Sequence, residues 1–320
     1  MEYIGAAILR REPSTAVLIP TCNHGRTELG IETQATSVVA EIRNWVRDYS
    51  PQSPSDINLR LSLIGHSLGG LILRHVAKML IQAPILPFCN IRMGHFITIA
   101  TPHLGSSWFS SLPPAIVASA VGKTGSELVL RDAFVSDSGR VDADHQDSQD
   151  PLLHRMARES DWMNALAAFQ SRTCYACTRY DLSVGIETAF FWPQNLLKDG
   201  NNVSGLLQSV IALFCCLPVL RGFLLTDAQK QRLQPQLLDV SELHCDLEDS
   251  SFNFADGGHD GHNSRIRSMI KSLNLLQWTR IAIFSTRPIF GHIDCIVKSK
   301  FWCEAYGESV IRDVVERVLI

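Results

Sequence analysis

The sequence predicts an α/β domain with a mostly parallel sheet and helices on both faces. Short apolar runs, which are typical of buried parallel strands, alternate with segments whose apolar residues recur every three or four positions. One of these runs leads directly into a Gly-x-Ser-x-Gly turn that opens a helical segment. Parallel strands joined by helices need right-handed crossovers, so this order of elements predicts helices on both sides of one sheet.

The expected strands are apolar runs bounded by turn-forming or polar residues. They lie at residues 16–19, 59–64, 96–100, 173–180 and 281–284. Four segments have helical periodicity, at residues 33–49, 71–80, 151–169 and 302–320. In the last helix the apolar stripe that should face inward consists of Val310, Ile311, Val314, Val315 and Val318.

Two segments interrupt this alternation. Residues 135–150 are rich in aspartate and contain little that can be buried, so we expect a solvated loop. We expect residues 1–194 and 276–320 to form the main domain, with 195–275 inserted as a cap, lid or loop. Residues 201–220 carry no charge. A buried or lid helix is the favoured interpretation, with a membrane-spanning helix and a peripheral membrane contact as alternatives.

Composition limits the partners and cofactors. The chain is 46% hydrophobic and 19% charged with a net charge of -3, so nothing favours a nucleic-acid surface. Nine cysteines at irregular spacing, without a leader peptide, predict a reducing, cytoplasmic compartment. We interpret Cys174 and Cys177 as core residues. The polar group of His244, Cys245, Asp246, His259, Asp260 and His262 contains no ligand pair with a recognised zinc-site spacing, so we expect no metal and no organic cofactor. Protein partners are not indicated.

The turn at Gly65 to Gly69 predicts a nucleophile. A serine hydroxyl needs a base to remove its proton and N–H groups to receive the oxyanion. A tight strand-to-helix turn exposes Ser67, and the glycines leave room for the crossing chains. The backbone N–H of Leu68, at the start of the helix, is the expected oxyanion donor.

The residues around this turn resemble a known family. Leu63 to Ile72, with its Gly-His-Ser-Leu-Gly-Gly core, and Ile99 to Ser106, with Thr-Pro-His-Leu-Gly, resemble the "putative serine esterase" family of eukaryotic lipase-like α/β-hydrolases. Later blocks within residues 151–185 extend the likeness, which covers residues 15–190 and 278–320. The resemblance implies the α/β-hydrolase fold and a catalytic triad in the order Ser, Asp, His.

Asp181 and His292 match the family's later triad positions. Asp181 follows the expected strand at 173–180 and would orient the imidazole, while His292 follows the strand at 281–284 and would be the general base. Asp161 is the poorer alternative carboxylate because it lies in a helical pattern. His259 and His262 are the alternative bases.

One part of the family pattern is not matched. Family members usually begin with a strand and a His-Gly loop that gives a second oxyanion N–H. In this chain only one expected strand precedes the strand at 59–64, which leads into the Gly-x-Ser-x-Gly turn, here called the elbow. Relative to the family pattern, we therefore expect that this chain lacks the first strands of the sheet. His24-Gly25 could substitute for the loop, but its neighbours resemble the family's second block, so we do not favour it.

The expected function is hydrolysis of carboxylic esters, with acyl lipids as the favoured substrates, through an acyl-enzyme on Ser67. The alternative is an N-terminally truncated, non-catalytic interaction protein that keeps the elbow sequence. Loss of one oxyanion donor costs about 10²- to 10³-fold in rate, so absence of the His-Gly loop would favour this non-catalytic alternative.

Overall fold

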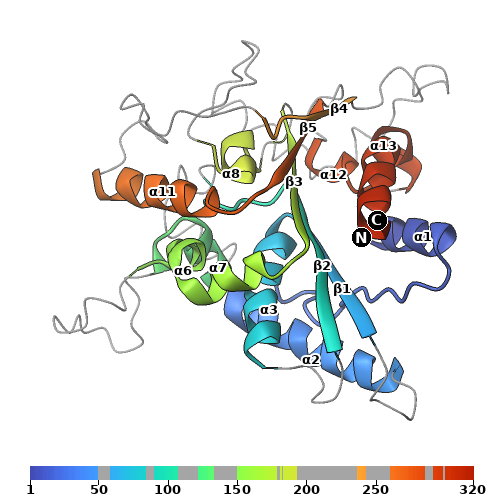
Figure 1. Ribbon diagram of the computed structural model, residues 1–320. Helices are drawn as coiled ribbons and strands as arrows, with labels where there is room; N and C mark the ends of the chain where they lie inside the picture. The colour runs from blue at the N-terminus through green and yellow to red at the C-terminus, as the bar shows by residue number, and fades with distance from the viewer. Residues whose placement is uncertain are drawn as a thin grey trace.

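A computed structural model describes most of the chain (Figure 1). The described residues are 1–49, 58–83, 90–106, 122–132, 150–178, 181, 183–192, 236–242, 260–284, 291–297 and 300–320. The aspartate-rich loop lies almost wholly outside these ranges, as does the uncharged stretch at 201–220.

The sheet has five strands in the order β1-β2-β3-β5-β4. Four of them run parallel: β1 (Asn58–His66), β2 (Asn90–Ile99), β3 (Ser171–Cys177) and β5 (Thr279–Phe284). The short edge strand β4 (Gln236–Asp239) is antiparallel to β5. The predicted α/β class with a mostly parallel sheet is therefore confirmed.

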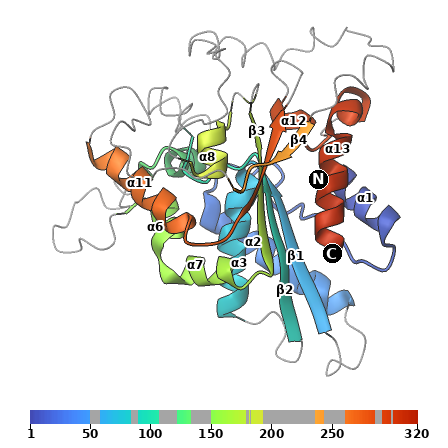
Figure 2. The same cartoon turned by 45° about the horizontal axis from the view of Figure 1, so that its top comes forward.

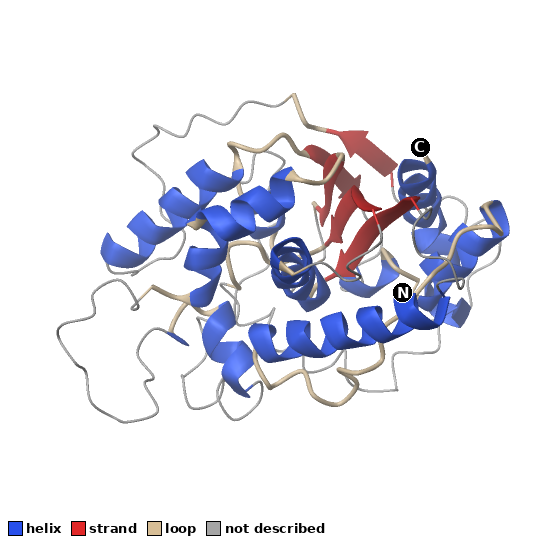
Figure 3. Cartoon of the chain, turned by 60° about the horizontal axis from the view of Figure 1, so that its bottom comes forward, coloured by secondary structure: helices blue, strands red, loops and turns tan. Residues whose placement is uncertain are grey.

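Helices cover both faces of this sheet (Figures 1 and 2). On one face are α2 (Ile31–Tyr49), α3 (Leu68–Gln82), α6 (Leu152–Arg158), α7 (Ser160–Ala167), α8 (Ile186–Phe190) and α11 (Asp260–Leu273). On the other face α1 (Glu2–Arg11) packs beside α13 (Lys300–Leu319), so the two chain ends lie close together. Figure 3 shows the strands enclosed between these helices.

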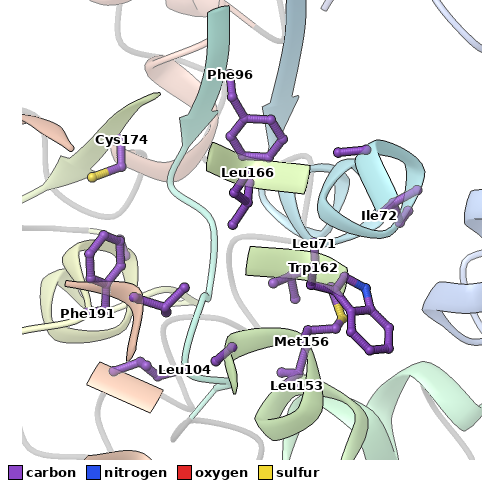
Figure 4. Packing of buried hydrophobic residues seen from close by; sticks show 14 of the residues in the cluster. Leu71, Ile72, Phe96, Leu104, Leu153, Met156, Trp162, Leu166, Cys174 and Phe191 are labelled. Atoms are coloured by element: carbon purple, nitrogen blue, oxygen red, sulfur yellow. The ribbon is translucent and has the colours of Figure 1, made fainter. Parts of the chain in front are cut away.

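Side chains of the central strands alternate between two cores, as a pleated sheet with both faces covered requires. In β3, Cys174 and Ala176 join the larger core while Tyr175 and Cys177 join the smaller one. The larger core also contains Phe96 and the residues of the helical face, including Trp162 (Figure 4). In the smaller core the five predicted inward residues of α13 are all buried.

The carboxyl ends of the parallel strands meet at one edge of the sheet. His66 at the end of β1 is in register with Ile99 of β2, which is in register with Tyr175 of β3. Cys177 of β3 is in register with Ile283 of β5. In an open parallel sheet, ligands bind outside this edge. The segments that follow β1, β2, β3 and β5 therefore start beside one another.

The predicted strand at 16–19 is wrong: these residues have no strand pairing. Their side chains are partly buried: Val17 packs against the smaller core and Leu18 against the larger one, and Val17 and Ile19 lie 3.2 and 3.1 Å from the position that a Cβ on Gly5 of α1 would take. An apolar run of this length indicates contact with a core, and partial burial outside a strand provides that contact as well as a sheet does.

Part of the predicted insertion packs on the main domain. β4 extends the sheet, and α11 contacts α6 and places Ile266, Met269, Ile270 and Leu273 in the larger core. A cap formed by the rest of residues 195–275 stays a prediction. Within the described ranges, no helix combines the length and hydropathy that a membrane span needs.

Candidate active site

Ser67 occupies a strained turn between β1 and α3. Its backbone has φ 54° and ψ −130°, in a region that non-glycine residues rarely adopt. The Ser67 N–H donates to the carbonyl of Ile99 at 2.9 Å, and the Ser67 carbonyl accepts from the N–H of Gly70 at 3.1 Å. These bonds fix the serine at the carboxyl edge of the sheet, directly after the last residue of β1.

Two glycines make this turn sterically possible. A Cβ on Gly65 would lie 2.6 Å from the backbone N and Cα of Gly70. A Cβ on Gly70 would lie 2.1 Å from Oγ1 of Thr101. Gly69, by contrast, has no atom within 4 Å of such a Cβ. The close approach of strand, helix and the turn after β2 therefore depends on Gly65 and Gly70, whereas the final glycine of the Gly-x-Ser-x-Gly motif has free space.

Asp181 and His292 are joined by a hydrogen bond. Nδ1 of His292 lies 2.8 Å from Oδ2 of Asp181. The Asp181 side chain is 1% exposed and that of His292 is 19% exposed, so the bond is shielded while the imidazole still reaches solvent. Asp181 accepts at Oδ2, which makes Nδ1 the protonated nitrogen and leaves Nε2 of the neutral ring as the acceptor.

The second oxygen of Asp181 is held by its own loop. Oδ1 accepts from the N–H and the hydroxyl of Ser183, both at 3.0 Å, and from the N–H of Val184 at 2.9 Å. Three donors on one oxygen fix the carboxylate plane and stabilise its charge. Asp181 is thereby set to orient an imidazole.

His292 lies on α12 (Gly291–Asp294), which sits against the elbow. Nε2 of His66 is 2.8 Å from the carbonyl oxygen of His292, and the two ring centroids are 4.6 Å apart. Ser67 is the next residue after His66, so the structure brings all three predicted triad residues to one place. No hydrogen bond joins the hydroxyl of Ser67 to the ring of His292 in the described part of the chain.

Leu68 is the first residue of α3. Amides in the first turn of a helix have no carbonyl partner within the helix, and the helix dipole favours negative charge there. The geometry thus suits the predicted oxyanion role of the Leu68 N–H.

The turn with His24 and Gly25 is fastened to α2. The amides of Thr21 and Cys22 donate to the carboxylate of Glu41, at 3.1 to 3.2 Å. His24 and Gly25 themselves are exposed, and no contact with a described residue ties them to Ser67.

The alternative triad residues lie elsewhere. Asp161, on α7, accepts from Nε2 of Gln82 at 2.7 Å and lies 3.7 Å from Nζ of Lys78. His262 lies on α11, where burial and the nearby Arg265 and Arg131 lower its pKa. His259 is outside the described residues.

A buried polar layer supports the turn after β2. His103 is fully buried and binds Thr98 Oγ1 through Nε2 at 3.0 Å. Burial, together with the charges of Arg74 and Arg280, holds the pKa of His103 well below its usual value, so this ring is neutral. Nη1 of the buried Arg74 donates to the His103 carbonyl at 3.4 Å. The sequence pattern gave no sign that a buried arginine would brace this turn.

Among the described residues, Cys22, Cys174, Cys177 and Cys295 form no disulfide bond, and burial raises the pKa of Cys174 to about 12. In the part of the chain that the structure describes, no group of three or more His, Cys, Asp or Glu side chains could hold a metal ion.

Comparison with known proteins gives a family match and a curated relative. A family described as "putative serine esterase" matches residues 1–191 of the chain. The chain belongs to this family. The matched residues of this serine esterase family member include Ser67 and Asp181, while His292 lies beyond them. A protein of Saccharomyces cerevisiae named "putative lipase YDL109C" is 31% identical over 119 residues. That match covers 37% of this chain and 16% of the yeast protein.

Proposed function

We propose that this serine esterase family member hydrolyses carboxylic esters of acyl lipids with a triad of Ser67, His292 and Asp181. The observation that carries the proposal is the hydrogen bond of 2.8 Å between His292 and a buried Asp181, beside a serine held at positive φ. Few structural roles require a strained serine, an oriented histidine and a shielded carboxylate at one sheet edge.

The reaction follows from the protonation states. Nε2 of His292 takes the proton of the Ser67 hydroxyl as its oxygen attacks the acyl carbon, and the Leu68 N–H stabilises the oxyanion. The protonated imidazole, stabilised by Asp181, then gives its proton to the departing alcohol. Water attacks the acyl-enzyme, with His292 again accepting the proton, and the carboxylic acid leaves as Ser67 regains its hydrogen.

Acyl lipids are proposed as substrates for two reasons. The yeast relative is named as a lipase, and the uncharged residues 201–220 of this chain could supply an acyl-binding wall or a membrane contact. A cytoplasmic location and peripheral membrane association stay predictions.

The test is hydrolysis of p-nitrophenyl esters of increasing acyl length by the purified chain. We expect turnover that increases from short to long acyl chains and that is lost in Ser67→Ala and His292→Gln. Ser37→Ala and His24→Gln are matched controls, because Ser37 donates only to the Thr33 carbonyl of its own helix and His24 is exposed. Turnover that survives in Ser67→Ala would overturn the triad, and a preference for short chains would overturn the acyl-lipid assignment.

A further inference from the structure

The helix that carries His292 is too short to hold its own position. α12 has four residues, and an isolated helix of one turn is unstable in water. The bond from Asp181 holds Nδ1 at one corner of the ring but leaves the backbone of His292 free to shift. Other contacts must therefore fix the distance between this backbone and Ser67.

Among the described residues, His66 makes a direct side-chain hydrogen bond to this backbone. A carbonyl oxygen can only accept, so the distance of 2.8 Å to the His292 carbonyl means that Nε2 of His66 carries a hydrogen and donates it. The two rings are also in contact, with centroids 4.6 Å apart and planes tilted by 48°. His66 is the last residue of β1, in register with Ile99, so its side chain projects from a rigid base.

Two thiols make weaker contacts with the same helix. Sγ of Cys295 donates to the His292 carbonyl at 3.1 Å, and Sγ of Cys177 donates to the Gly291 carbonyl at 3.4 Å. Thiols are weak donors. The imidazole is thus the strong donor at this carbonyl, and it comes from the residue that immediately precedes Ser67.

We infer that His66 is a positioning residue, which holds the backbone of His292 against the nucleophile turn through its Nε2–H. The inference rests on the proposed role of His292 as the base. His66 does not touch the reacting atoms; it sets the separation of Ser67 and His292 through the chain. A misplacement of about 1 Å can cost about 10²-fold in rate, so the contact matters to catalysis.

Three variants separate the hydrogen bond from the packing of the ring. His66→Gln keeps an N–H donor at nearly the position of Nε2, whereas His66→Asn has a donor that is too short to reach. His66→Phe keeps the ring and removes the donor. We expect kcat for a p-nitrophenyl ester to stay within about 3-fold of wild type in the Gln variant and to fall about 10- to 100-fold in the Asn and Phe variants, with little change in KM. Equal thermal midpoints would exclude misfolding.

A second readout does not need turnover. The ¹⁵N chemical shifts of His292 report which ring nitrogen carries hydrogen, and Asp181 selects the Nδ1–H form. We expect this form in wild type and His66→Gln, and a mixture of the two forms in His66→Asn and His66→Phe. His292→Ala assigns the signals.

The two claims fail separately. Equal rates and an unchanged Nδ1–H form in all three variants would overturn the role of His66 and leave the proposed hydrolase intact. Equal losses in the Gln and Asn variants would also overturn it. An inert wild type whose His292 form still follows the Gln-versus-Asn pattern would refute the proposed function while supporting the positioning by His66.

Discussion

At the scale of single residues, the site contains a strained backbone at Ser67 that hydrogen bonds hold in place. Backbone in a sparsely populated region costs on the order of 1–3 kcal/mol, and the bonds from Ser67 to Ile99 and Gly70 hold the serine there. The sequence motif predicted this turn because its strand-turn-helix context can be recognised locally. The contact between His66 and His292 could not be predicted, because it joins residues 226 positions apart and leaves no periodic pattern.

Alanine substitutions of Gly65 and Gly69, the first and last glycines of the Gly-x-Ser-x-Gly motif, should change the free energy of unfolding differently. Gly65→Ala forces a Cβ against the Gly70 backbone, which cannot move without opening the elbow. We expect a loss of about 1–3 kcal/mol in the free energy of unfolding. Gly69→Ala meets open space within α3 and should be neutral or stabilising by up to about 1 kcal/mol. Urea denaturation of both variants measures the difference; equal losses would contradict the steric argument.

Asp181→Asn should lower kcat far more than stability. An amide in place of the carboxylate cannot stabilise the protonated imidazole and allows the wrong ring nitrogen to carry hydrogen. We expect a fall in kcat on the order of 10³- to 10⁴-fold. Asp161→Asn is the control, because it removes a carboxylate from α7 that is 51% exposed. Comparable rates for Asp181→Asn and the control would show that Asp181 has no catalytic role.

At the scale of elements, residues 122–132 fasten α2 to the rest of the domain. Oε2 of Glu127 accepts from the N–H of Ile31 at 2.8 Å, and Oγ1 of Thr124 accepts from Gly30 at 3.0 Å. The carbonyl of Leu128 accepts from Ser106, in the turn after β2. A helix start and the loop beside the elbow are thus held by one segment, which no sequence pattern had singled out.

Glu127 should make this attachment sensitive to pH. Burial raises its pKa from about 4.5 to about 7, although the Ile31 bond opposes the shift. The folded state therefore binds the proton more tightly than the unfolded chain, and this group lowers stability as pH rises from 4.5 to 7. Glu127→Gln keeps an acceptor for Ile31 without the charge.

We expect the Gln variant to gain stability over wild type as pH rises, by up to about 3 kcal/mol between pH 4.5 and pH 8. Urea unfolding at several pH values measures the gain, with Glu308→Gln on the exposed face of α13 as the control. A difference that stays constant across this range would contradict the burial of an ionisable Glu127.

Sequence periodicity predicted elements well where one face is buried along their whole length. α2 and α3 match the expected segments, since their apolar stripes repeat over several turns. The expected helix at 151–169 forms as two helices, α6 and α7, which a break at Glu159 separates. The short β4 has too few residues for a periodic signal, and the apolar run at 16–19 is only partly buried and forms no strand.

At the scale of the whole molecule, parallel topology assembles the site. Ser67, Asp181 and His292 follow three different strands, and the sheet register places the ends of those strands at one edge. The family resemblance placed these residues after three expected strands, and a parallel sheet brings the carboxyl ends of such strands to one edge. The resemblance could not predict their hydrogen-bond partners, which depend on the conformations of loops and of the short α12.

The most direct measurement is covalent labelling of the purified chain by a fluorophosphonate, with the modified residue identified by mass spectrometry. The account predicts one adduct, on Ser67, which Ser37→Ala retains and which Ser67→Ala and His292→Gln abolish. A folded wild-type chain that takes no label, or that takes it on another serine, would contradict the account.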